Sequence, residues 1–291
     1  MRLTALTVLS VTIVGATLVA WLWINGDEEG SDAVGPQPIA TLDTPDVHSL
    51  LIDPADAEHV LFGSHAGVME SRDGGYTWAD GSLRNTDAMS MAVSPANPAT
   101  IFVTGHNVVE VSRDGGATWQ PLQHDLPGTD IHAFAQDLTS PDVLYASVAG
   151  HGVLMSENGG AGWAPLGNQP PGGAPLSLAA DGSRVYAVTQ DGIVASGDRG
   201  ETWRALPAQP AGSTVTLSLS QPDPRIIYAG TTDGLARSTD GGASWTALGP
   251  TGVTVLALAV APTEPQRVAL VAGGGGVYRS DDGGATWRTP T

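Results

Sequence analysis

One eight-residue motif occurs six times in this 291-residue chain, and its spacing constrains the fold more than any other feature of the sequence. It reads SRDGGATW at residues 112–119. The other copies begin at residues 71, 156, 196, 238 and 280, so successive copies start 40 to 44 residues apart. A fixed period of this size, with turn residues at fixed offsets, is typical of stacked supersecondary units. Six of the eight tryptophans end these boxes, which indicates a periodic structural role for them.

Each repeat contains four short segments with the composition of β-strands. In the first repeat they are residues 48–53, 59–64 and 68–71 and a segment that opens at Trp78. Four strands that meander antiparallel form one propeller blade, and a single blade cannot bury both of its faces. The repeats run without a gap from residue 44 to 291, and no helical period appears after residue 24. We therefore predict an all-β, six-bladed β-propeller over residues 44–291, in which residues 38–43 could close the ring against the last blade.

The repeated box is predicted to be the turn between the third and fourth strands of each blade. Its acidic residue can accept hydrogen bonds from backbone N–H groups of the same turn, and Gly75 in the first copy supplies a positive φ. In the third copy Gly162 replaces threonine and asparagine replaces aspartate, so we expect a weaker turn there. The structural residues at the acidic position are Asp73, Asp114, Asn158, Asp198, Asp240 and Asp282.

The N-terminal segment differs in composition from the repeats. Residues 3–24 carry no charge, and a transmembrane helix needs about 20 apolar residues. Arg2 precedes this segment and an acidic stretch follows it, so the positive-inside rule places the remainder outside the cytoplasm. We predict a membrane anchor over residues 1–24, an acidic linker over 25–43 and a single-pass cell-membrane protein with its propeller outside. Cleavage of the segment as a signal peptide would instead give a secreted protein.

The overall charge limits the classes of partner. The chain has a net charge of −18, with 30 acidic side chains against 12 basic ones, all of them arginine. This balance argues against nucleic-acid binding and against membrane contact other than through the N-terminal helix. The absence of cysteine excludes disulfides, thiolate metal sites and cysteine nucleophiles.

The boxes resemble the Asp-box, or BNR, repeats of the sialidase-like superfamily. Similar boxes occur in sortilin-type receptor propellers, photosystem II assembly-factor propellers and bacterial proteins labelled glycosyl hydrolases. The phrase HAFAQDLTSPDVLYAS at residues 132–147 is most similar to the last group. The resemblance implies a propeller more firmly than it implies a reaction. The arginine triad and Tyr–Glu pair of true sialidases cannot be placed here, so sialidase activity is not expected.

Polar residues open the first strand in only three of the repeats. The pairs are Asp46 with His48, Asp87 with Met89, and Asp130 with His132, whereas the later repeats have uncharged residues at the matching positions. Strand alternation places both members of a pair on the same side. The turn between strands two and three opens on the same face, opposite the boxes, and carries His65, His106 and His151, while His124 lies in the loop that leads to His132. We expect all these side chains to converge at the channel mouth of blades one to three.

The polar groups of this cluster could simply solvate the rim of the channel. Three functional interpretations also remain open. The first, which we favour, is a recognition or assembly module that binds a protein or glycan ligand at the mouth. The second is a glycoside hydrolase in which two of Asp46, Asp87 and Asp130 serve as acid and as base or nucleophile. The third is a copper or zinc protein, with metal ligands drawn from His48, His65, Met89, His106, His132 and His151. The remaining histidine, His59, is interpreted as a surface residue of a second strand.

Overall fold

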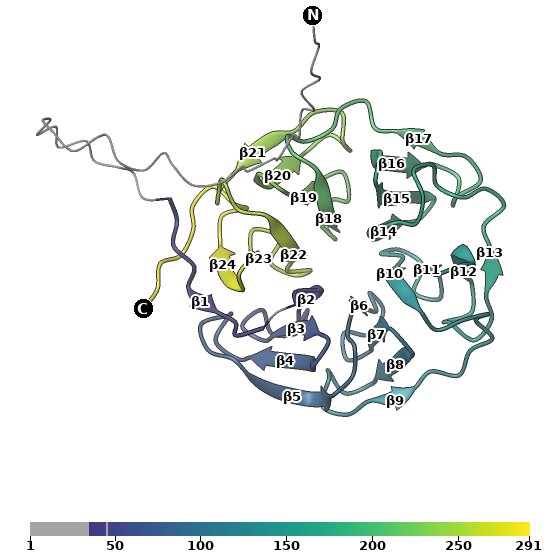
Figure 1. The fold of residues 1–291 in the computed structure, drawn as a ribbon, viewed down its shortest axis with the longest axis horizontal. Helices are drawn as coiled ribbons and strands as arrows, with labels where there is room; N and C mark the ends of the chain where they lie inside the picture. Colours follow the sequence, from purple (N-terminus) through teal and green to yellow (C-terminus); the bar gives the residue numbers. More distant parts are fainter. Residues whose placement is uncertain (1–34, 45) are drawn as a thin grey trace, which may run out of the picture. The chain divides into compact units, whose positions relative to one another are not determined.

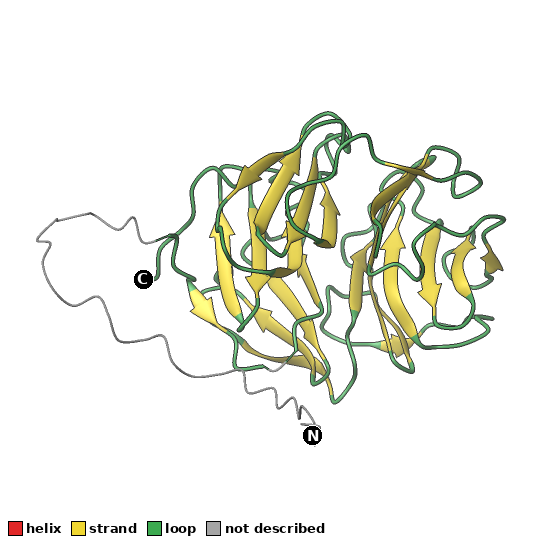
Figure 2. Cartoon of the chain, turned by 45° about the horizontal axis from the view of Figure 1, so that its top comes forward, coloured by secondary structure: helices red, strands yellow, loops and turns green. Residues whose placement is uncertain are grey.

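Six antiparallel four-stranded sheets make up a β-propeller, as the repeats predict. The computed structural model describes residues 35–44 and 46–291, so the predicted membrane anchor at residues 3–24 lies outside the described residues. Figure 1 shows the sheets arranged as a ring around a central channel, and Figure 2 shows only strands and loops in this part of the chain. No helix within the described ranges is long and apolar enough to cross a membrane.

Each blade follows the chain outward from the channel, with its first strand innermost (Figure 1). Blades 1 to 3 are built from β2 (Ser49–Ile52), β3 (Val60–Ser64), β4 (Gly67–Ser71) and β5 (Ala79–Arg84); β6 (Ser90–Val93), β7 (Ile101–Gly105), β8 (Val108–Ser112) and β9 (Gln120–Pro121); and β10 (Ile131–Gln136), β11 (Leu144–Val148), β12 (Gly152–Ser156) and β13 (Ala164–Pro165).

Blades 4 and 5 repeat this plan, and blade 6 combines three strands of the last repeat with a strand that precedes blade 1. They are built from β14 (Ser177–Asp181), β15 (Arg184–Thr189), β16 (Gly192–Ser196) and β17 (Arg204–Ala205); β18 (Thr214–Leu219), β19 (Ile227–Thr231), β20 (Gly234–Ser238) and β21 (Thr246–Leu248); and β22 (Val255–Val260), β23 (Val268–Ala272), β24 (Gly276–Ser280) and β1 (Ala40–Thr41).

The ring is closed by β1, which pairs antiparallel with β24. The N–H of Ile39 donates to the Val277 carbonyl at 2.8 Å, and the N–H of Leu42 donates to the Gly275 carbonyl at 2.9 Å. Both side chains are buried, so the clasp combines backbone pairing with apolar burial. It supplies the outer strand that blade 6 lacks and covers the edge of β24, which would otherwise be open to pairing with other chains.

Charged side chains reinforce the seam between blades 6 and 1. Arg279, on β24, is buried and donates to both carboxylate oxygens of Glu58 at 2.7 and 3.0 Å. Arg267 also donates to Glu58, at 2.9 Å, and both arginines donate to Asp281. Hydrogen bonding from Arg279 lowers the pKa of Glu58 below its ordinary value. A buried guanidinium requires such partners, so the first and last repeats are joined specifically.

The core lies between the blades, in six apolar clusters that each contain one box tryptophan. Trp119 of blade 2, for example, packs on the cluster shared with blade 1, which includes Leu61 and Val103. Its indole N–H donates to the Ser82 hydroxyl of blade 1 at 3.0 Å. All six box tryptophans are only partly buried. Each therefore covers the outer edge of an interface between neighbouring blades, as expected from the period.

The boxes share one hydrogen-bond pattern. In the second box the Ser112 hydroxyl donates to Asp114 at 2.8 Å, and Asp114 accepts the Thr118 backbone N–H at 2.8 Å and the Thr118 hydroxyl at 2.6 Å. These bonds, led by that hydroxyl, lower the pKa of Asp114 to about 2. The third box keeps the backbone bond, from Gly162 to Asn158 at 2.7 Å, but its glycine has no hydroxyl to donate. This confirms that the third turn has one hydrogen bond fewer.

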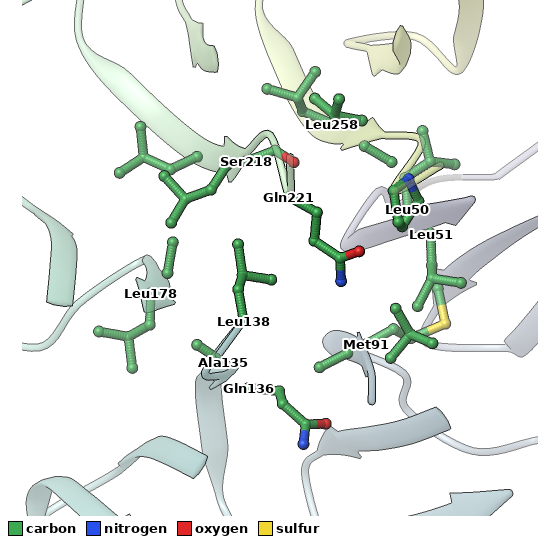
Figure 3. Close-up of a pocket in the computed structure, with 18 of the residues that line it drawn as sticks. Leu50, Leu51, Met91, Ala135, Gln136, Leu138, Leu178, Ser218, Gln221 and Leu258 are labelled. Atoms are coloured by element: carbon green, nitrogen blue, oxygen red, sulfur yellow. The ribbon is translucent and has the colours of Figure 1, made fainter. Parts of the chain in front are cut away.

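Apolar side chains line the central channel. They come from matching positions of the six innermost strands: Leu50, Met91, Phe134, Leu178, Leu217 and Leu258. Figure 3 shows Leu138 and Gln221 reaching into the same space, which has a volume of about 170 Å³. The lining is therefore largely aliphatic, with the amides of Gln136 and Gln221 among its polar groups.

Candidate functional site

Strand register places the predicted cluster and the boxes on opposite faces. In blade 1, β3 and β4 pair Ser64 with Gly67 at one end and Val60 with Ser71 at the other. His65 follows the first of these pairs, and the first box begins at Ser71. The backbone N–H of His48 donates to the Gly63 carbonyl at 3.2 Å, which puts the entry to β2 at the His65 end. The mouth that carries the histidines therefore faces away from the boxes.

Four histidines and the three predicted aspartates meet at this mouth as an arc that runs from blade 1 to blade 3. We call it the Asp–His arc, and its members are Asp46, His48, His65, Asp87, His106, Asp130 and His132. The centroids of neighbouring imidazole rings are 4.3 Å apart for His48 and His65, 6.3 Å for His65 and His106, and 5.3 Å for His106 and His132. The alignment of first strands thus predicts the core of the cluster correctly.

The first half of the arc alternates carboxylates with imidazoles. Nδ1 of His65 lies 2.8 Å from Oδ2 of Asp46, and its Nε2 lies 3.8 Å from Oδ1 of Asp87. The other oxygen of Asp87 pairs with Nδ1 of His106. An imidazole ring thus stands between Asp46 and Asp87. The space that a glycoside hydrolase keeps for a sugar between its two carboxylates is taken by this ring.

The second half of the arc depends on contacts between blades 2 and 3. The Asn107 N–H donates to the Thr129 carbonyl at 2.8 Å and holds the turn that carries His106 beside the entry to β10. Nε2 of His106 lies 3.2 Å from Oδ1 of Asp130, and Nε2 of His132 lies 2.9 Å from the same oxygen. His132 sits at a register shift in the pairing of β10 with β11. Such a bulge re-aims a side chain, which here points toward Asp130.

His48 and Asp87 form the least exposed part of the arc. Their side chains are 17% and 11% exposed, against 44% to 51% for the other three imidazoles. Nε2 of His48 lies 3.8 Å from Oδ1 of Asp87, which is too long for a hydrogen bond. Neither atom has another partner. Burial lowers the pKa of His48 below 6.5, an effect that the nearby His65 reinforces and Asp87 opposes. His48 is therefore neutral at neutral pH.

The predicted convergence of six histidines is wrong for His151 and His124. The turn in blade 3 places three residues between the paired Val148 and Gly152, whereas the turns that carry His65 and His106 place two between their paired residues. His151 is the last residue of this longer turn, so its ring is set beside Gly128. His124 instead accepts the backbone N–H of Leu126 at 3.2 Å within its own loop.

Met89 lines the wall of the channel together with His48 and Leu176. Leu176 occupies the position in blade 4 that matches His48 in blade 1, and it is 60% exposed. Blades 1 and 4 stand across the ring from each other (Figure 1). The mouth is therefore asymmetric, with the Asp–His arc on blades 1 to 3 and the exposed aliphatic side chain of Leu176 on blade 4.

His59 corrects a further expectation. It is buried rather than at the surface, and its two ring nitrogens lie 2.9 Å from Asp53 and 3.3 Å from Glu70. It precedes β3 and therefore belongs to the box face. Sequence reasoning missed it because the combination of a histidine with both of these carboxylate partners occurs in blade 1 alone. The pairing explains how a histidine is tolerated in the core.

The six sheets make the described part of the chain a six-bladed β-propeller, and the recurring box bonds are those of Asp-box turns. The BNR/Asp-box repeat family matches residues 278–289, which contain the whole of the last box, residues 280–287. A search of curated proteins by sequence gives no match. The predicted resemblance to Asp-box propellers is thereby confirmed at the level of the repeat and the fold.

Solved structures with the same fold include a glycoside hydrolase and YCF48 propellers. A GH74 xyloglucanase from Xanthomonas campestris is 19% identical with a TM-score of 0.56, and the match covers 82% of this chain but 45% of that one. YCF48 from Cyanidioschyzon merolae is 21% identical with a TM-score of 0.53, covering 87% of each chain. YCF48 bound to D1 peptide is also 21% identical, with a TM-score of 0.51, covering 89% of this chain and 83% of that one. At these identities the likeness concerns the fold.

Proposed function

We propose that this propeller is a recognition or assembly module that binds a segment of a partner protein at the mouth carrying the Asp–His arc. The observation that carries the proposal is the asymmetry of this mouth. Charged and imidazole groups gather on blades 1 to 3, and Leu176 stands exposed on blade 4. Solvation of a channel rim alone would not require such a division. A peptide with both polar and aliphatic side chains matches it.

The fold comparisons support a binding role without assigning a ligand. YCF48 is described in complex with a D1 peptide, and its match spans most of both chains. The xyloglucanase match spans under half of that enzyme. In this proposal residues 3–24 hold the chain in the cell membrane and the propeller meets its partner outside the cytoplasm. A glycan ligand is the competing occupant, and the experiment below includes it.

The proposal is tested by selecting binders from a displayed peptide library with the full-length chain in mild detergent, alongside a glycan array. Selected peptides should lose most of their affinity for Leu176→Asp, because a charge replaces the exposed aliphatic contact. The matched control is Arg113→Ala, a change at an exposed position in the second box on the opposite face. Peptides that bind both variants equally, or glycan binding that Leu176→Asp abolishes, would contradict a peptide site at this mouth.

A further inference from the structure

Two buried polar atoms that face each other at the mouth have no hydrogen-bond partner. They are Nε2 of His48 and Oδ1 of Asp87, 3.8 Å apart. Nε2 of His65 lies at the same distance, 3.8 Å, from the same Asp87 oxygen. A buried polar group without a partner costs about 1–3 kcal/mol. Two of them opposite each other indicate a missing ligand that both could bind.

The surrounding hydrogen bonds determine which kind of ligand this is. Nδ1 of His65 lies 2.8 Å from Asp46, an acceptor, so this nitrogen carries the proton and the lone pair is on Nε2, toward Asp87. Oδ2 of Asp87 is already paired with His106, which leaves Oδ1 for the mouth. The Nε2 atoms of His48 and His65 thus both lie 3.8 Å from Oδ1 of Asp87. With the lone pairs of both imidazoles turned toward Asp87, a single water could donate to only two of these three atoms, whereas a cation could contact all three.

We propose that His48 Nε2, His65 Nε2 and Asp87 Oδ1 are the ligands of one divalent transition-metal ion, and that the ion is zinc. Two imidazoles and one carboxylate are a known ligand set for zinc sites that keep an open fourth position. Bonds of about 2.0–2.1 Å in tetrahedral geometry place ligand atoms roughly 3.4 Å apart. The two 3.8 Å separations from Asp87 need to shorten by a few tenths of an ångström, and the half-exposed ring of His65 has room to turn toward His48.

Neighbouring residues complete the site. Asp46 and His106 orient the ligands His65 and Asp87 as a metal site's outer partners do. The second half of the arc is not part of the site, because Asp130 already accepts from His132 and is paired with His106. The fourth position of the ion faces the mouth. One further step rests on the proposed function: a carboxylate or imidazole of the partner segment would take that position.

Zinc binding is tested on the full-length chain after treatment with a chelator and dialysis, by calorimetric titration with Zn²⁺ and by the visible spectrum of the Co²⁺ form. We expect one equivalent to bind and the Co²⁺ spectrum of a four-coordinate ion. Asp87→Asn and His48→Leu should each weaken binding by about 100-fold or more, and Asp46→Asn by roughly 10–100-fold. The matched controls His132→Ala and His151→Ala should change the affinity less than 3-fold. The chain has no cysteine, so thiolates cannot contribute.

Circular dichroism and thermal melting verify that each variant is folded. If Asp87→Asn does not fold, His48→Leu provides the test of the metal site. No binding below millimolar Zn²⁺, or equal affinity in wild type and His48→Leu, would overturn the assignment. Peptide binding is measured separately, with and without the chelator. If the wild-type chain binds peptide but not zinc, the metal site alone is overturned. If the wild-type chain binds zinc but no peptide, the recognition function alone is overturned.

Discussion

Nε2 of His48 and Oδ1 of Asp87 lie 3.8 Å apart at the channel mouth, both buried and both without a hydrogen-bond partner. A structure that served stability alone would place an aliphatic side chain at position 48, as blade 4 does with Leu176. The pair therefore marks a position at which the fold gives up stability, as functional sites commonly do.

This relationship leads to a stability prediction for His48→Leu. The change removes a buried nitrogen without a partner, whose burial costs about 1–3 kcal/mol. We expect the metal-free variant to be more stable than wild type by about 1 kcal/mol, which raises the melting temperature by roughly 2–4 °C. Thermal melts in the presence of a chelator measure this. A lower melting temperature for the variant would show that the imidazole is stabilising.

The missing hydrogen bond of the third box can be restored by substitution. Asn158→Asp combined with Gly162→Thr restores the hydroxyl-to-carboxylate bond that Thr118 makes in the second box. We expect a gain of about 0.5–1.5 kcal/mol, the usual net contribution of one hydrogen bond. Urea unfolding of the double variant measures it. Asn158→Asp alone is the control and should gain less, since no hydroxyl is present to donate.

Acid should weaken the boxes over a defined range. The pKa of Asp114 is lowered from 3.8 to about 2 in the folded chain, mainly by the Thr118 hydroxyl. Its contribution to stability is therefore present above about pH 4 and is lost as the pH falls through about 2. In Asp114→Asn the free energy of unfolding should fall less steeply across that range. Asp191→Asn, an exposed turn position outside the boxes, is the control. Identical slopes for the two variants would contradict the prediction.

The closing strand β1 should contribute as much to the free energy of unfolding as a strand of the core. Ile39 and Leu42 are 7% and 4% exposed, so truncation of either to alanine should cost about 2–4 kcal/mol. Chemical unfolding with tryptophan fluorescence as the probe measures the loss. Thr41→Ala, at an exposed position of the same strand, should change stability by less than about 0.5 kcal/mol. Wild-type stability in both truncated variants would mean that the ring holds without the clasp.

Glycoside hydrolysis is expected to be absent. An imidazole ring stands between Asp46 and Asp87, and Asp130 is occupied by two histidines. A hydrolase requires two carboxyl groups about 5–9.5 Å apart with room for the sugar between them. A broad panel of chromogenic glycosides and polysaccharides should give no turnover. Turnover that Asp87→Asn abolishes in a folded protein would reinstate the hydrolase interpretation.

The fold was predictable because its information is repeated six times. The box and its tryptophan recur at a near-constant spacing, and their local bonds fix the turn in each blade. The meeting of His48 and His132 followed from the alignment of strand starts, and the approach of His65 and His106 followed from the turns between the second and third strands. The position of His151 could not be predicted in this way. One extra residue in its turn changes where the side chain points, and the length of a turn is not visible in a short motif.

The sequence likewise could not predict that Oδ1 of Asp87 lacks a hydrogen-bond partner. The lack of a partner depends on which carboxylate oxygen His106 takes, a matter of rotamers and of distances between separate blades. His59 was misplaced for a related reason, since its burial depends on a combination of two local partners that occurs in blade 1 alone. Sequence features that recur in every repeat thus predict the propeller fold. Contacts that occur in one blade alone, such as those of His59, become visible only in the three-dimensional structure.

The clasp between β1 and β24 also sets the order in which this protein can be completed during synthesis. Among the strands of the ring, β1 is the first to leave the ribosome and β24 the last. At about 5–20 residues per second, roughly 10–50 seconds pass between the two. Five blades can stack in that time, but β1 has no partner until translation reaches β24. Premature termination within the last repeat would therefore leave a complete set of earlier blades that cannot close.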